Sequence, residues 1–309
     1  MSSLIEQAAQ RLEQLRQAGV VLPDIETPAF APTPAPPATP ATPAARAEPA
    51  EPVTQSRRVE LNLDAIAAAG IVTPSAPRST IADQFRVIKR PLIANAVGKG
   101  ATTLTHGNLI MVTSAMAGEG KSFTSVNLAM SMVAELDHTV MLVDADVARP
   151  SVLRMLGLPP GPGLLDVLEG KAELSDALLR TNIDKLTILP SGTPHPRATE
   201  LLASEAMSKL LDDMATRYPD RIIIFDSPPL LLTTESRVLA SHMGQIVVVV
   251  AAGRTLQAAV QQALDTIEAC PVRLLVLNKA RMDSKAYGYG YGYGYGYGYG
   301  ESATQQAEG

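Results

Sequence analysis

The chain has 309 residues, a formal net charge of −5, one cysteine and no tryptophan. The lone Cys270 excludes a disulfide framework and a cysteine-based zinc site, and the acidic balance argues against a surface made for nucleic acid. The longest apolar run, Ile246–Ala252, is far shorter than the ~20 residues of a membrane span, and the polar, charged segment Met1–Gly19 lacks the features of a secretory signal. We therefore expect a cytoplasmic protein that binds no nucleic acid.

The N-terminal part of the chain has an unusual composition. Residues 1–19 are expected to form an amphipathic helix, because they carry apolar residues at helical spacing, namely Leu4, Ile5, Ala8, Leu12 and Leu15. Ten prolines lie between Pro23 and Pro52, and alanine and threonine fill most of the space between them. Residues 20–77 are therefore expected to form a disordered Ala/Pro-rich linker.

The C-terminal end is unusual in a different way. Tyrosine and glycine alternate without a break over Tyr287–Gly300, and this stretch holds seven of the eight tyrosines. Glycine at every second position raises the entropy cost of ordering the backbone, so a disordered tail is predicted over residues 287–309. The folded domain is expected between the two ends, over residues 78–286.

Within that domain, short apolar runs alternate with longer segments of helical period. The runs are nearly all apolar, as expected for strands covered on both faces, and comprise Leu109–Thr113, Val140–Asp144, Leu186–Leu189, Ile222–Asp226, Ile246–Ala251 and Leu274–Leu277. Helical stretches include Phe123–Leu136, Glu200–Arg217 and Gln257–Glu268, and a short helical patch, Leu63–Gly70, precedes the domain within the predicted linker. This alternation predicts an α/β fold with a mostly parallel, doubly wound sheet, whose ligands bind beyond the carboxyl ends of the strands.

The end of the first predicted strand has the pattern of a phosphate-binding loop. The segment Thr113–Ser122 reads TSAMAGEGKS, with Ala115 at the position of the usual first glycine. Small residues let backbone N–H groups turn toward phosphate oxygens, and the following helix adds its positive end. Lys121 is expected to reach the β- and γ-phosphates, and the Ser122 hydroxyl to bind Mg²⁺. The expected nucleotide contacts are Ala115, Met116, Ala117, Gly118, Glu119, Gly120, Lys121, Ser122 and Phe123.

Two further strands are predicted to end in carboxylates. Asp144 and Asp146 follow one of them, and Asp226 ends another. A carboxylate at such a strand end suits a Mg²⁺ site beside a phosphate loop, although each acid alone also fits a helix cap or a turn. Together with the phosphate loop, the three acids and Lys121 are predicted to be catalytic, with Asp144 and Asp226 joining Ser122 as metal ligands.

The last predicted strand is followed by a segment that bears on the choice of base. Asn278 and Lys279 stand where GTPases of this general class carry an Asn-Lys-x-Asp guanine reader, but Arg281 replaces the carboxylate. Adenine is therefore favoured over guanine. Asn278 either faces the base or supports the turn, and the sequence leaves both alternatives open.

These segments resemble the bacterial tyrosine kinases of exopolysaccharide and capsule synthesis, and more narrowly the autokinases linked to exosortase-type polysaccharide loci. The resemblance covers residues 78–300 and places Walker A at Ala115–Ser122, Walker A′ at Val140–Asp146 and Walker B at Ile222–Pro229. It implies ATP, Mg²⁺ and autophosphorylation of a C-terminal tyrosine cluster. The corresponding acceptors are Tyr287, Tyr289, Tyr291, Tyr293, Tyr295, Tyr297 and Tyr299.

The resemblance also implies partners. They are a membrane-spanning polysaccharide co-polymerase of the chain-length determinant type, a cognate tyrosine phosphatase and further copies of this chain in a ring. The kinase would then lie at the inner face of the cell membrane. The family's oligomerisation segment, a glutamate followed at three and six residues by arginines, corresponds here to Asp83, Arg86 and Lys89, with Arg90 adjacent. The same residues also fit an ordinary surface pair on a helix.

Phosphoryl transfer to tyrosine needs a base that removes the hydroxyl proton, because the phenol has a pKa near ~10. Asp144 is the leading candidate, with Asp146 and Asp226 assisting through Mg²⁺. The family's Walker A′ arginine falls on Ala148, so Arg149, the next residue, is an uncertain substitute.

Two rival classes share parts of this pattern. Partitioning ATPases carry a second lysine near the start of the loop, where this chain has Met116. A non-catalytic, nucleotide-gated scaffold with an adhesive tail would not require Lys121, Ser122, Asp144 and Asp226 together. We therefore expect an ATP-dependent protein-tyrosine autokinase that regulates exopolysaccharide polymerisation and export.

Overall fold

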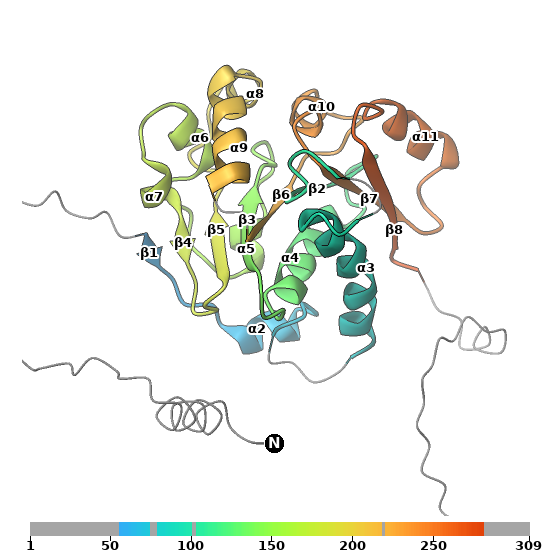
Figure 1. The fold of residues 1–309 in the computed structure, drawn as a ribbon, viewed down its shortest axis with the longest axis horizontal. Helices are drawn as coiled ribbons and strands as arrows, with labels where there is room; N and C mark the ends of the chain where they lie inside the picture. Colours follow the sequence, from blue (N-terminus) through green and yellow to red (C-terminus); the bar gives the residue numbers. More distant parts are fainter. Residues whose placement is uncertain (1–55, 75–78, 101–102, 218–219, 281–309) are drawn as a thin grey trace, which may run out of the picture. The chain divides into compact units, whose positions relative to one another are not determined.

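The computed structural model describes residues 56–74, 79–100, 103–217 and 220–280 (Figure 1). Its eight strands form one sheet in the order β1-β4-β5-β3-β6-β2-β7-β8. Every neighbouring pair is parallel except β4 and β5, which run antiparallel. The predicted mostly parallel α/β sheet is confirmed.

The strands are β1 (Arg57–Arg58), β2 (Leu109–Ser114), β3 (Thr139–Asp144), β4 (Leu179–Arg180), β5 (Leu186–Leu189), β6 (Arg221–Asp226), β7 (Gln245–Ala251) and β8 (Val272–Asn278). The helices are α2 (Leu63–Ala68), α3 (Thr80–Ala96), α4 (Lys121–Met132), α5 (Val152–Met155), α6 (Leu164–Leu168), α7 (Leu174–Ala177), α8 (Ala198–Leu202), α9 (Glu205–Arg217), α10 (Glu235–Ala240) and α11 (Gln257–Asp265).

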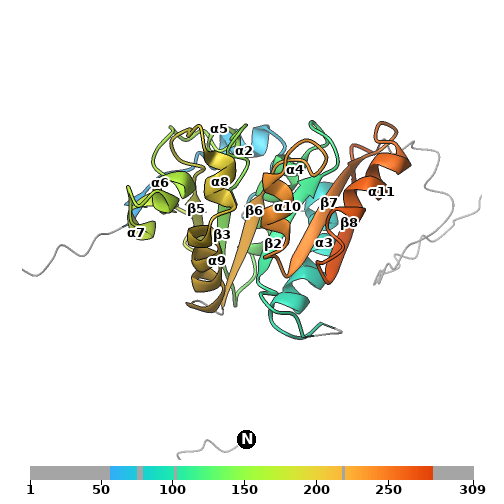
Figure 2. The same ribbon diagram turned by 90° about the horizontal axis from the view of Figure 1, so that it is seen from above.

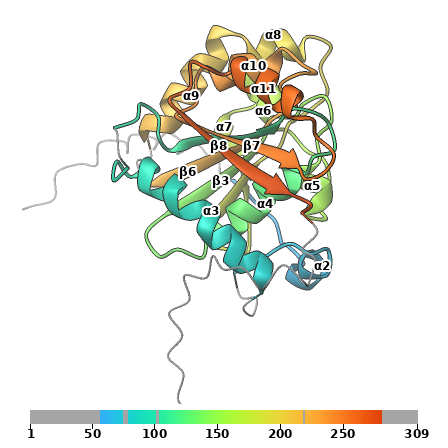
Figure 3. The ribbon, with the colours of Figure 1, turned by 90° about the vertical axis from the view of Figure 1, so that its right-hand side faces the viewer.

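Two hydrophobic cores lie on opposite faces of the sheet. Successive residues of a strand point to opposite faces, so Leu109 and Met111 enter one core while Ile110 and Val112 enter the other. Helices α2 to α5 cover one face and α6 to α11 the other, as Figures 2 and 3 show. Continuous apolar strands are thereby explained, because both faces are buried.

Strand β8 departs from this rule. Its residues alternate between half-buried and exposed, and Leu275 and Leu277 are 56% and 65% exposed. The expectation of a strand covered on both faces is wrong here, because β8 lies at the end of the sheet order. The predicted helix over Glu200–Arg217 is also divided into α8 and α9, since the Ser204 hydroxyl accepts from the backbone N–H of Met207 and begins a new helix.

The domain begins earlier than residue 78. Strand β1 pairs with β4, and Leu61 and Ile66 lie in the core that α3 and α4 share. The side chain of Asn182 bonds both the N–H and the C=O of Leu61, which ties this segment to the sheet. Residues 56–74 therefore pack on the domain and correct the linker boundary expected at residue 77. The helix predicted over residues 1–19, the rest of the linker and the tail over 287–309 lie outside the described residues.

Candidate active site

The phosphate-loop segment connects β2 to α4. Gly118 and Gly120 have φ angles of 80° and 103°, in the left-handed region that favours glycine. A Cβ atom on Gly120 would come within 2.1 Å of Nδ2 of Asn278, so this position is restricted by space as well as by backbone geometry. The helix that begins at Lys121 presents its free N–H groups at the carboxyl edge of the sheet.

Two neighbouring segments hold this loop in place. The buried carboxylate of Glu119 accepts from the backbone N–H of Met116 at 2.6 Å and from the hydroxyl of Thr255. From the end of β8, Nδ2 of Asn278 donates to the carbonyl of Glu119 at 2.9 Å, and Nζ of Lys279 donates to the carbonyl of Gly118 at 2.6 Å. The side chains of Glu119 and Asn278 thus support the loop, and their predicted contacts with nucleotide stay predictions. Arg281 lies outside the described residues.

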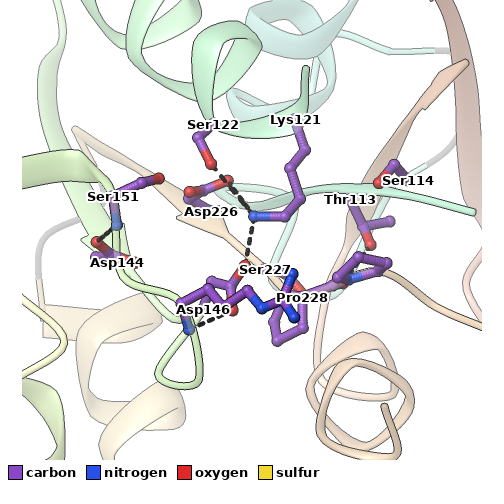
Figure 4. A network of polar contacts seen from close by, with 12 residues as sticks. Thr113, Ser114, Lys121, Ser122, Asp144, Asp146, Ser151, Asp226, Ser227 and Pro228 are labelled. Atoms are coloured by element: carbon purple, nitrogen blue, oxygen red, sulfur yellow. Dashed lines mark hydrogen bonds and ion pairs between the residues drawn. The ribbon is translucent and has the colours of Figure 1, made fainter. Parts of the chain in front are cut away.

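Three neighbouring strands bring the predicted catalytic residues together. Strands β3, β6 and β2 are adjacent in the sheet, and Figure 4 shows their polar side chains converging. Nζ of Lys121 lies 2.6 Å from Oδ2 of Asp146 and 3.7 Å from Oδ1 of Asp226. It also donates to the hydroxyl of Ser122 at 3.2 Å. The cluster therefore forms from side chains that are far apart in the sequence.

Asp144 lies beside this cluster, at the end of β3. Its Oδ2 accepts from the backbone N–H groups of Ser151 and Val152, at 3.0 and 2.9 Å, at the start of α5. Its Oδ1 is buried and has no hydrogen-bond partner among the described residues. Burial, together with the nearby Asp226 carboxylate, raises the pKa of Asp144 to about 7, while the two N–H groups oppose the shift.

Asp226 is the most deeply buried acid of the cluster. Burial raises the pKa of Asp226, and Lys121 lowers it in opposition. The hydroxyl of Ser125 donates to Oδ1, whereas Oδ2 lacks a partner in the described part of the chain. Oxygen atoms left unpaired on two buried carboxylates beside a phosphate loop are suitable ligands for a divalent cation.

A cavity of about 500 Å³ opens over these side chains. Lys121, Ser122 and Asp146 form its polar wall, together with Arg149. Pro228 and Pro229, at the end of the Walker B segment, line it as well, together with Leu232 and Thr233, which were not predicted from the sequence. Ser125, also unassigned, lies one helical turn after Lys121, and that spacing was the signal available for it. Arg149 lines the same cavity, and its backbone N–H donates to Oδ1 of Asp146 at 3.2 Å.

The predicted oligomerisation residues separate into two groups on α3. Asp83 and Arg86 form an exposed ion pair, and Arg90 is exposed nearby. Lys89 instead points inward, with its Nζ 2.7 Å from Oε1 of Glu135. Its position on the buried face, with Ala82, Phe85 and Leu92, follows from the helical repeat. Lys89 is therefore wrong as a surface contact, because its charge is used inside the domain.

Comparison with known families agrees with this geometry. The ParA family model, described as NUBPL iron-transfer P-loop NTPase, matches residues 105–279. That range includes the loop, all three acids and the strands that carry them, so the fold and the site define a P-loop NTPase of the ParA type.

Comparison with individual relatives identifies the family within this class of P-loop NTPases. The chain is 31% identical to the tyrosine-protein kinase YwqD of Bacillus subtilis (strain 168) over 205 residues, which cover 66% of this chain and 83% of YwqD. It is 33% identical to the tyrosine-protein kinase CpsD of Streptococcus agalactiae over 187 residues, or 59% of this chain and 80% of CpsD. The crystal structure of the chimerical protein CapA2B2 matches with a TM-score of 0.55 and 26% identity, covering 69% of this chain and 97% of that one. The chain belongs to the bacterial tyrosine-protein kinase family and is a protein-tyrosine kinase.

Proposed function

We propose that this kinase transfers the γ-phosphoryl group of ATP to the tyrosines of its own C-terminal cluster, Tyr287–Tyr299, and thereby regulates exopolysaccharide polymerisation and export. The observation that carries the proposal is the convergence of Lys121, Asp146 and Asp226 beside the unpaired oxygen of Asp144. The same chain supplies seven acceptors for that site.

The residues present fit ATP with Mg²⁺. The unpaired Oδ2 of Asp226 and the Ser122 hydroxyl are oxygen donors of the kind that Mg²⁺ prefers, which leaves Oδ1 of Asp144 free for a proton. Mg²⁺ bound with ATP would offset negative charge on the phosphates. Lys121, now paired with Asp146, would contact the phosphates beside the loop. Gly118 and Gly120 leave the loop backbone free to approach them.

Asp144 is the proposed base. A pKa of about 7 leaves its carboxylate ready to accept a proton at neutral pH, which is the condition for an efficient general base. The unpaired Oδ1 is the atom that would accept the proton of the tyrosine hydroxyl, because Oδ2 already accepts from Ser151 and Val152.

The proposed assembly follows from the surface of α3. Asp83, Arg86 and Arg90 are exposed on this helix and are the proposed contacts of a ring of identical chains. In the described part of the chain no helix is long and apolar enough to cross a membrane. We place the kinase at the inner face of the cell membrane through a co-polymerase of the chain-length determinant type, with a cognate phosphatase that removes the phosphates. The family resemblance supports these partners, and it also supports the exosortase-linked subgroup.

The two rival classes fit less well. Met116 takes the place of the second lysine that partitioning ATPases use, and it is 42% exposed at the start of the loop. A non-catalytic scaffold has no use for a base-like Asp144. Named relatives such as YwqD and CpsD are tyrosine kinases.

Replacing Lys121 tests the proposal. Lys121→Met should reduce tail phosphorylation by about 10²-fold or more, because the charge that meets the phosphates is lost. The exposed Lys171→Met is the matched control and should be phosphorylated like wild type. Anti-phosphotyrosine signal with ATP and Mg²⁺ is the measurement, and circular dichroism checks the fold. Equal phosphorylation of Lys121→Met and wild type would reject the assignment.

A further inference from the structure

Apolar side chains on α3 and β8 lie open at the edge of the sheet. Val87, Leu275 and Leu277 are 74%, 56% and 65% exposed. All three line one cavity of about 560 Å³, and Ile81 and Ile88 of α3 line it as well. An apolar surface that clusters in this way usually receives another segment of protein. Leu274 and Val276 pack on the core that α3 covers, so Leu275 and Leu277 point to the other face of the sheet, and we define the α3–β8 surface by Ile81, Val87, Ile88 and Val276.

The backbone of β8 is open at the same place. β8 is last in the sheet order, and within the described residues it pairs with β7 alone. Its outer N–H and C=O groups can therefore accept an added strand. Arg273 is the one charged residue between Val272 and Asn278, so charge gives this edge little protection against pairing.

The sequence after β8 has the period and composition that fit this edge. Ala280 lines the cavity, and six residues, 281–286, separate it from Tyr287. Six residues are enough for a reversal of the chain. Tyrosine at every second position matches the two-residue period of a strand, so all rings fall on one side, and tyrosine favours strands.

We propose that Tyr287–Gly300 docks on its own domain as an antiparallel strand along β8, with its tyrosine rings packed on the α3–β8 surface. β8 has seven residues, so about four tyrosines, those from Tyr287 to Tyr293, lie alongside it. The tail is nearly neutral, which suits an apolar cavity. Glycine at alternate positions weakens the added strand, so the docked segment is released readily.

Docking has a consequence for the site, and this step rests on the proposed function. β8 ends at the carboxyl edge, where Asn278 contacts the phosphate loop. An antiparallel return therefore carries the tyrosines along β8 away from Lys121. The docked tail withholds its acceptors, and release from the α3–β8 surface supplies them to a neighbouring site.

Tyrosine fluorescence of the full chain tests the docking without a label. Seven of the eight tyrosines lie in the tail and there is no tryptophan, so the signal reports almost entirely on the tail. Ile81→Ser combined with Val87→Ser should raise the acrylamide quenching constant by roughly twofold, because about four of seven rings lose their cover. The matched control is Leu136→Ser combined with Leu256→Ser, at positions 86% and 75% exposed elsewhere. Equal quenching in the two double variants would overturn the proposal.

Hydrogen exchange of β8 supplies a second readout. Serine at Tyr287, Tyr289, Tyr291 and Tyr293 should speed exchange of the β8 amides, whereas serine at Tyr295, Tyr297 and Tyr299 should leave it unchanged. Both effects should be independent of protein concentration, since the tail is part of the same chain. Protection that grows with concentration and with mass in light scattering would mean that a second copy covers the surface, and docking within one chain would be wrong. All arms omit ATP, so their failure leaves the kinase assignment untouched.

Discussion

At the scale of single residues, Asp144 should make the stability of the domain depend on pH. Its pKa is 3.8 in a model compound and about 7 in the folded protein. Between these values the folded state binds more protons than the unfolded state, so stability from this residue is present at low pH and is lost as pH rises toward 7. In the nucleotide-free protein, Asp144→Asn should therefore raise the free energy of unfolding at pH 8, by up to about 4 kcal/mol, with no gain near pH 4.

Urea unfolding at pH 4, 6 and 8 without nucleotide or Mg²⁺ is the measurement. Asparagine keeps an oxygen for the N–H groups of Ser151 and Val152, so the comparison isolates the charge. Asp184→Asn, at an exposed position, is the control and should show no such trend. A constant difference between wild type and Asp144→Asn at all three pH values would contradict the burial argument.

Thr255 has a positional role that a single substitution can expose. Its hydroxyl donates to the buried carboxylate of Glu119, which holds the loop through the N–H of Met116. Thr255→Val keeps the shape and removes one donor to a buried charge, which should cost about 1–3 kcal/mol and weaken ATP binding. Urea unfolding and calorimetry with ATP measure the two effects. Thr216→Val, whose hydroxyl bonds only carbonyls of its own helix in the described structure, should leave ATP affinity unchanged.

At the scale of elements, α3 divides its basic residues between the domain and the surface. Lys89 pairs with Glu135 and donates to the carbonyl of Ser131 at the end of α4, while Arg90 is exposed. Lys89→Met should destabilise the domain by about 1–3 kcal/mol, because it leaves the Glu135 carboxylate without its cation. Arg90→Met should stay within about 0.5 kcal/mol of wild type. The urea unfolding midpoints of both variants measure these changes. An equal loss of unfolding free energy in Lys89→Met and Arg90→Met would contradict the assignment of Lys89 to the interior.

These elements also show how far sequence alone reaches. The central strands and the phosphate loop were predicted because their signals are local: an apolar run, then glycines, then Lys121. Some strands begin one residue earlier than predicted, because a polar residue such as Thr139 or Gln245 still pairs with the neighbouring strand. The two-residue strand β1 has no local signal, because it exists through pairing with β4. The burial of Lys89 depends on Glu135, a residue far along the chain, and the helical repeat alone does not identify that partner.

The same reasoning applies to the site. The acids were predicted from their places at strand ends, and the parallel sheet brings those ends together. The role of Glu119 in holding the loop was not predicted, and for Asn278 a structural role was predicted only as an alternative and only in its own turn, because both contacts depend on how β2–α4, β7–α11 and the end of β8 are arranged. The sequence therefore predicts which functional residue lies at the end of each strand. The contacts that hold the phosphate loop can be identified only when the arrangement of all the elements is known.

At the scale of the whole molecule, charge connects the tail to assembly. Seven modified tyrosines would add roughly −10 to −14 charges, since each phosphate carries about −1.5 to −2 near pH 7. In the proposed ring, tails of neighbouring chains lie close together, so this charge should drive the assembly apart. Wild type should therefore shift toward monomer in ATP and Mg²⁺, and high salt should weaken the shift, because exposed charges are screened beyond ~8–10 Å.

Phenylalanine in place of all seven tail tyrosines, from Tyr287 to Tyr299, gives the matched variant. It keeps the aromatic rings, so it should still pack on the α3–β8 surface, but it removes every acceptor. That variant should stay assembled when ATP and Mg²⁺ are added, while wild type dissociates. An adhesive tail predicts association that ignores ATP and that the phenylalanine exchange hardly changes. Light scattering of both proteins before and after ATP separates these outcomes, and an unchanged wild-type mass despite confirmed phosphorylation would reject release by charge.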